Sequence, residues 1–115
     1  KGDREGASRQ MAKNYEFFGA PHVAIITTPK ELGAYGVLDC GAFITAFTLA
    51  AAALGVSSIP QAAIAGRATI VREVLNIHED RDVLCAISFG FADTDHPANN
   101  FRTQRANLDE FVEWV

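Results

Sequence analysis

Hydrophobic and polar positions change their spacing several times along the chain, and each change predicts a different element. Residues 7–18 have mixed polarity with apolar residues four apart, which predicts a helix. Residues 23–28 form a β-branched run between turn residues, which predicts a buried strand. Residues 82–91 are continuously apolar, which predicts a central strand covered on both faces. Residues 57–60 predict a short extended piece.

The longest predicted helix covers residues 37–54, after a connection over residues 29–36, and ends before Gly55. Its surface is apolar on nearly every side, so it should be buried on nearly every side. One stripe consists of alanines spaced three and four apart, which would let a second helix approach closely: Ala42, Ala46, Ala50 and Ala53. So small a domain can hardly surround this helix, so a partner chain or a missing domain should cover part of it. We expect a homodimer through residues 37–54; burial within one chain is the alternative.

The remaining segments complete the predicted fold. Residues 92–107 are polar and loop-like, and residues 108–115 predict a last helix capped by Asn107. An amphipathic pattern over residues 67–76 predicts a helix that buries Ile70, Val71, Val74 and Leu75. This order predicts a single α+β domain over residues 1–115, with a mixed sheet flanked by helices and a long buried central helix.

Composition narrows the class of protein. A chain of 115 residues with 49% hydrophobic content and a net charge of −4 suits one folded domain and does not suit a disordered chain. The acidic balance and the lack of a basic stripe argue against nucleic-acid binding. The apolar run over residues 40–56 is shorter than the ~20 residues that span a bilayer, so we expect no membrane segment. Cys40 and Cys85 lie in separate apolar runs, so we expect reduced, buried thiols in a cytoplasmic protein.

No standard catalytic motif occurs, so no catalytic side chain is assigned and any difficult chemistry must come from a cofactor. Neither cysteine has a histidine at ligand spacing, so no metal site is predicted. Two features could still bind a cofactor. The first is a segment of mostly small residues, Pro60, Gln61, Ala62, Ala63 and Ile64. Its exposed main-chain N–H groups would suit a flat heteroaromatic ring, although an ordinary turn would have the same sequence. The second is the pair Arg102 and Arg105. Two guanidinium groups three residues apart can bind a phosphate, although they are also common in a solvated loop.

Four stretches in the same order resemble FMN-dependent nitroreductases. LDCGAFITAFTLAAAALGVSSIPQAAIA, residues 38–65, resembles the long central helix and the flavin loop of that family. VREVLNIHEDRDVLCAISFGFAD resembles the following helix and strand, NNFRTQRANLDEFVEWV resembles the family's tail, and NYEFFGAPHVAIIT resembles a strand entry. The resemblance therefore covers nearly the whole chain.

The resemblance implies roles for individual residues. The loop matching residues 60–64 lies along the isoalloxazine ring of FMN, and the N–H groups matching Ala62 and Ala63 bond flavin N5 and O4. The tail arginines reach the FMN phosphate, a role carried to Arg102 first and to Arg105 second. Gln104 replaces the proline that usually stands between the two arginines.

The resemblance also implies a reaction. NAD(P)H reduces the flavin, which then reduces a small nitroaromatic or quinone-like acceptor in a ping-pong scheme; some members of the family dehalogenate or desaturate instead. Family members are about twice as long and begin with an Arg-x-Ser-x-Arg segment that is absent here. We therefore expect the C-terminal half of the fold, either a fragment or a natural truncation. The alternative function is a non-catalytic, dimerising relic that binds FMN weakly or not at all.

Overall fold

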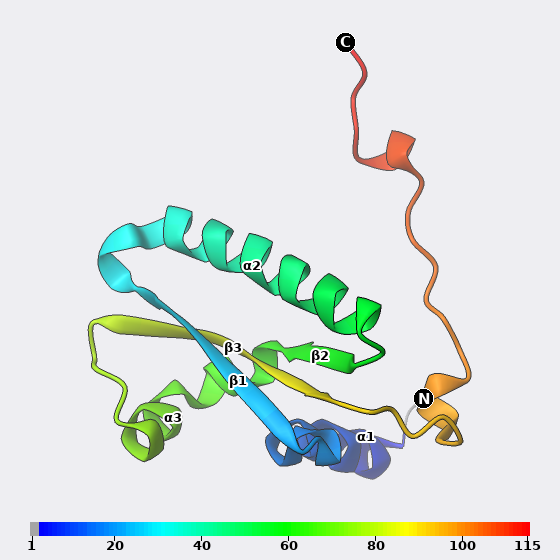
Figure 1. Cartoon of the computed structure of the whole chain (residues 1–115), viewed down its shortest axis with the longest axis horizontal. Helices are drawn as coiled ribbons and strands as arrows, with labels where there is room; N and C mark the ends of the chain where they lie inside the picture. Colours follow the sequence, from blue (N-terminus) through cyan, green and yellow to red (C-terminus); the bar gives the residue numbers. More distant parts are fainter. Residues whose placement is uncertain (1–2) are drawn as a thin grey trace.

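Three antiparallel strands and the helices on their two faces form the body of the protein (Figure 1). The structure is a computed structural model that describes residues 3–115. Its α-helices are Arg4–Ala12 (α1), Gly33–Ala53 (α2) and Ala68–Leu75 (α3), and its strands are His22–Pro29 (β1), Ser57–Gln61 (β2) and Arg81–Gly90 (β3). Short 3₁₀ segments are Lys13–Gly19 (η1), Lys30–Leu32 (η2), Ala62–Arg67 (η3), Pro97–Asn99 (η4) and Leu108–Glu110 (η5).

The sheet has the strand order β1-β3-β2, so the most apolar strand is central, as its sequence predicts. Both pairings are antiparallel, with His22 opposite Phe89 and Gln61 opposite Ala86. The expectation of a mixed sheet is therefore wrong for the described strands: β1 and β2 run in the same direction, but β3 lies between them and is antiparallel to both, so no parallel pairing forms.

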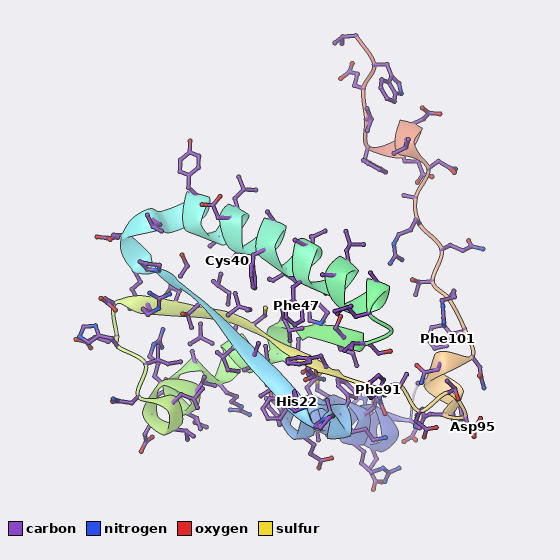
Figure 2. All side chains as sticks on the ribbon, in the orientation of Figure 1. His22, Cys40, Phe47, Phe91, Asp95 and Phe101 are labelled. Carbon is purple, nitrogen blue, oxygen red and sulfur yellow. The ribbon has the colours of Figure 1, made fainter. Side chains whose placement is uncertain are left out.

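Helix α2 covers one face of the sheet. The core there consists of Ile26, Cys85 and Ile87, and Cys40, Ile44 and Phe47 of α2 are among the side chains packed against it. Figure 2 shows Cys40 and Phe47 between α2 and the strands. The helix ends as predicted, since Gly55 follows it with a φ of +74°.

The alternative that α2 is buried within one chain is wrong for this chain, whereas its cover by a partner stays a prediction. Within the helix only Gly36 and Ala51 are buried, whereas Leu38 is 68% and Leu49 is 67% exposed. The helix also begins at Gly33, earlier than predicted. The outer face of α2 is thus apolar and uncovered.

The length of this helix also corrects an argument from the sequence. Residues Lys30–Ala53 form a helical stretch of 24 residues that is long and apolar enough to cross a membrane. Helix length therefore does not argue against a membrane span. What argues against a membrane span is that α2 packs against a sheet with open edges, whose backbone groups would have no hydrogen-bond partners in lipid.

The other face of the sheet carries α3, η3 and η1. The prediction that α3 buries its apolar side chains is wrong: Ile70 is 56%, Val74 is 74% and Leu75 is 52% exposed. These side chains line an apolar groove of about 490 Å³ together with Val23 and Ile25 of β1. They stay exposed because no element of residues 3–115 crosses this part of the sheet.

The two ends of the chain differ from the predicted helices. The helix expected over residues 7–18 splits, because α1 ends at Ala12 and Phe17 and Phe18 both take a φ of +53° within η1. The helix expected over residues 108–115 is only the 3₁₀ turn Leu108–Glu110. A helix this short is not stable without a packing surface, and the tail runs away from the sheet (Figure 1).

Candidate functional site

The small-residue segment lies where β2 passes into η3, on the face of the sheet opposite α2. Gln61 is the last residue of β2 and pairs with Ala86 of β3, and η3 starts at Ala62. A 3₁₀ helix has three residues per turn, so side chains three apart lie on one side. Gln61, Ile64 and Arg67 are spaced in this way, and each contacts another element.

The side chain of Gln61 connects three segments of the chain. It is 2% exposed, and its Nε2 donates to the main-chain oxygen of Asn14 in η1 at 2.9 Å. Its Oε1 accepts a hydrogen bond from the hydroxyl of Ser88 in β3, which is 1% exposed. Both ends of the amide are therefore occupied within the protein, and the side chain is not available to a ligand.

The other two inward residues hold η3 further along. Ile64 is 4% exposed. The guanidinium of Arg67 lies 5.6 Å from the centre of the Tyr15 ring, within cation–π distance. Because Tyr15 directly follows Asn14, η1 contacts both ends of the small-residue segment.

The outward side of the segment carries only small side chains. Pro60, Ala62 and Gly66 are exposed, whereas Ala63 and Ala65 are half-buried. A flat molecule can approach this side without meeting a long side chain. Ala62 and Ala63 are the first residues of η3, and the first N–H groups of a helix have no partner within it.

The two arginines of the predicted phosphate site lie apart from this segment, in the tail. Arg102 lines a broad hollow of about 1070 Å³ together with Ser58 of β2 and Lys13 of η1. Its Nη1 donates to the main-chain oxygens of Asn99 at 2.9 Å and Phe101 at 2.8 Å. Residues 60–64 and Arg105 are not among the residues that line this hollow. The structure thus brings Arg102 beside β2 but does not gather all the predicted site residues around one cavity.

Arg105 is bonded locally. Its Nη1 donates to the hydroxyl of Thr103 at 2.6 Å, and its side chain is exposed. Both arginines are in a part of the tail without regular structure, which agrees with the predicted loop over residues 92–107 apart from the turn Pro97–Asn99.

Among residues 3–115, the histidines and cysteines outside this segment form no second site. His22 stacks on Phe89 with ring centres 5.4 Å apart, and exposed His78 contacts Asp80 at 2.9 Å. Within residues 3–115 no group of three or more His, Cys, Asp or Glu side chains could hold a metal ion. Burial raises the pKa of the Cys85 thiol, and Cys40 nearby raises it further.

Sequence reasoning located the segment and named Gln61 and Ile64 within it, but it did not predict that these side chains hold the segment in place. The spacing of Gln61, Ile64 and Arg67 was a usable signal, because a period of three marks one side of a 3₁₀ helix. Asn14 and Ser88 offered none, since they lie 47 and 27 residues from Gln61 in the chain.

A family model described as the nitroreductase family matches residues 1–91. The chain belongs to the nitroreductase family. Nitroreductase NfnB of Mycolicibacterium smegmatis is 39% identical over 98 residues, which are 85% of this chain and 42% of that protein. A 4-nitrobenzoate reductase of Pseudomonas putida is 30% identical over 115 residues, which are 100% of this chain and 51% of that protein.

Solved structures give the same result. The FMN- and NADPH-dependent nitroreductase NfnB of Sphigopyxis sp. strain HMH has a TM-score of 0.96 at 28% identity and covers 100% of this chain. The FMN-dependent nitroreductase NfnB of Mycobacterium smegmatis in complex with NADPH has a TM-score of 0.92 at 33% identity. This chain spans 52% and 51% of those two chains, and about half the length of the curated relatives it matches.

Proposed function

We propose that this nitroreductase-family chain is part of an FMN-dependent oxidoreductase that takes electrons from NAD(P)H and reduces nitroaromatic or quinone-like acceptors. The observation that carries the proposal is the small-residue side of residues 62–66, which leaves the main chain open to a flat ring. Supporting it are relatives named as nitroreductases and neighbouring structures that are FMN- and NADPH-dependent.

The residues of the chain fit one edge of FMN. When bound, FMN supplies the acceptance of a hydride and its transfer onward in a ping-pong scheme. The N–H groups of Ala62 and Ala63 would donate to the ring edge, and Pro60 would border it, while Ile64, predicted as a neighbour of the ring, supports the loop from its buried side. Arg102 binds the phosphate, with Arg105 as a weaker second contact. No protein acid or base is needed for the first half-reaction, because positioning and main-chain donors suffice.

The proposal includes a homodimer through the outer face of α2. Leu38, Leu49 and Leu54 are 68%, 67% and 78% exposed, and Val37 is 49% exposed. The predicted alanine stripe lies on the exposed part of the helix, with Ala42, Ala46, Ala50 and Ala53 all exposed. An apolar surface of this extent, formed by side chains small enough for close approach, is typical of a helix–helix contact between subunits.

The test is a titration of the purified chain with FMN, followed by its visible spectrum and by calorimetry. Binding with a perturbed flavin spectrum, and bleaching on addition of NADPH or NADH, are the expected results. A protein that leaves the spectrum of FMN unchanged at high micromolar concentration would contradict the proposed function for this chain and favour the non-catalytic alternative.

A further inference from the structure

The side chain of Gln61 has a role that the flavin loop of the proposed function leaves open. Its amide is buried and fully occupied by Asn14 and Ser88. A residue at this place therefore acts through the protein and not by touching a ligand. Gln61 is also covalently joined to Ala62, the first of the two residues whose N–H groups are proposed to face the flavin.

We propose that Gln61 is a positioning residue, which holds the main chain of Ala62 and Ala63 at a fixed height and angle over the sheet. This inference rests on the proposed function only where it concerns the flavin. The positioning itself is a property of the chain without any ligand.

The side chain of Gln61 is held by two other elements. Gln61 binds η1 through Asn14 and binds β3 through Ser88. Ser88 lies in the central strand, which is hydrogen-bonded on both sides. The Ala62–Ala63 main chain thus starts from a point fixed in two directions.

The far end of the loop also contacts η1. Arg67 lies over Tyr15, the residue after Asn14, with 5.6 Å between the guanidinium and the ring centre. The loop is consequently held at both ends by two adjacent residues of η1. Ile64, 4% exposed, holds its middle. The outward alanines are thus supported by contacts that Gln61, Ile64 and Arg67 make on the inner side of the loop.

Loss of the Gln61 side chain would leave buried polar groups without hydrogen-bond partners. No buried side-chain nitrogen or oxygen lacks a hydrogen-bond partner within residues 3–115. Replacing Gln61 by an apolar residue of similar length leaves the buried Ser88 hydroxyl and the Asn14 oxygen without their partner. Because buried polar groups are costly when unpaired, the loop would move to let water reach them.

The test compares four variants of the whole chain by amide NMR and by FMN binding. Gln61→Met removes both hydrogen bonds, and Ser88→Ala removes one of them and serves if Gln61→Met does not fold. Asn14→Ala is the matched control, because it retains the main-chain oxygen 2.9 Å from Gln61 Nε2 and removes only the longer contact of 3.4 Å to the Asn14 side chain. Ile26→Val lowers stability from the core under α2, on the opposite face of the sheet, and controls for a general loss of stability.

In the unliganded protein we expect order parameters of about 0.85 for the Ala62 and Ala63 amides, falling below about 0.6 in Gln61→Met. Ser88→Ala should give a smaller decrease, and Asn14→Ala and Ile26→Val should give none. Unchanged order parameters in Gln61→Met would overturn the inference whether or not FMN binds. An equal decrease in Ile26→Val would also overturn it, because the effect would then be general.

With FMN present, Gln61→Met should weaken binding by about fivefold, the effect of losing one well-placed hydrogen bond. It should also shift the midpoint potential of the bound flavin, which Ile26→Val should leave unchanged. Normal potential and affinity in a variant with a disordered loop would overturn the flavin part of the inference. If FMN does not bind the unmodified chain, the proposed function fails while the NMR result still decides the role of Gln61.

Discussion

Gly36 of α2 lies directly against Thr28 of β1, so closely that a Cβ on Gly36 would meet the hydroxyl of Thr28 and lie 2.8 Å from the Cβ of Leu32. Gly36 and Thr28 are both buried. This approach lets the first turns of α2 lie on the sheet. A side chain at position 36 must push the helix away or displace Thr28.

We therefore expect Gly36→Ala to lower the free energy of unfolding. Overpacking of a buried contact costs about 1–3 kcal/mol, and the better helix propensity of alanine offsets up to about 1 kcal/mol of that. Urea unfolding followed by circular dichroism would measure the difference. Gly41→Ala is the matched control, because nothing lies within 4 Å of its Cβ position. This control should be neutral or stabilising; equal losses in both variants would contradict the close-approach argument.

The same contact explains what the sequence could not predict about α2. Gly33 and Gly36 look like loop residues, so residues 29–36 were predicted as a connection, yet the helix begins at Gly33. The need for a glycine at position 36 comes from Thr28, which lies in another element. Gly55, in contrast, was predicted correctly, because a glycine just after a helix is favoured for a purely local reason.

In the candidate site, too, some features follow from local sequence and others depend on distant residues. The position of the small-residue segment between a strand and a helical turn follows from local pattern, and the structure has it there. The use of Gln61 as an internal link depends on Asn14, 47 residues away. The predicted cap Asn107 does start the turn Leu108–Glu110, but a cap alone does not stabilise a longer helix, which needs a packing surface.

The buried thiol of Cys85 gives a prediction about pH. Its pKa in the folded protein is raised above the ordinary value of 9.0, chiefly by burial. The folded state thus favours the neutral thiol, and this contribution to stability is complete below pH 9.0 and is lost as the pH rises through the folded-state pKa. Urea midpoints measured across this range should fall less steeply in Cys85→Ala than in the unmodified chain. A parallel fall in the two proteins would contradict the assignment.

The two cysteines should also be reduced and unpaired. Cys85 is buried in β3, and Cys40 is half-buried on α2 with its Sγ 3.9 Å from the main-chain oxygen of Thr27. Alkylation under denaturing conditions followed by mass spectrometry should label both thiols. In the folded protein we expect Cys40 to react before Cys85. A disulfide between them would contradict this expectation.

The uncovered face of α2 predicts self-association. Light scattering should give at least twice the mass of one chain, and Ala46→Glu should reduce it to a monomer, because it places a charge on the small-residue stripe. Ser8→Glu, on the exposed surface of α1, is the control and should leave the mass unchanged. A monomeric unmodified chain would show that α2 is covered in some other way.

The last prediction concerns the tail arginines and the ring edge. Arg102 lines the hollow beside β2 and Arg105 does not, so Arg102→Ala should weaken FMN binding by about 1.5–3 kcal/mol, as expected for a hydrogen bond to a charged group. Arg105→Ala should weaken it less. Calorimetry of both variants at equal salt concentration would measure the two effects.

Ala62→Pro completes this comparison, because it removes a main-chain N–H without adding charge. It should change the redox potential of the bound flavin more than its affinity, which is the reverse of the effect of Arg102→Ala. The two substitutions thus separate donation to the ring from binding of the phosphate. If Arg105→Ala proves the more harmful of the arginine variants, the tail must move on binding so that Arg105, and not Arg102, reaches the phosphate.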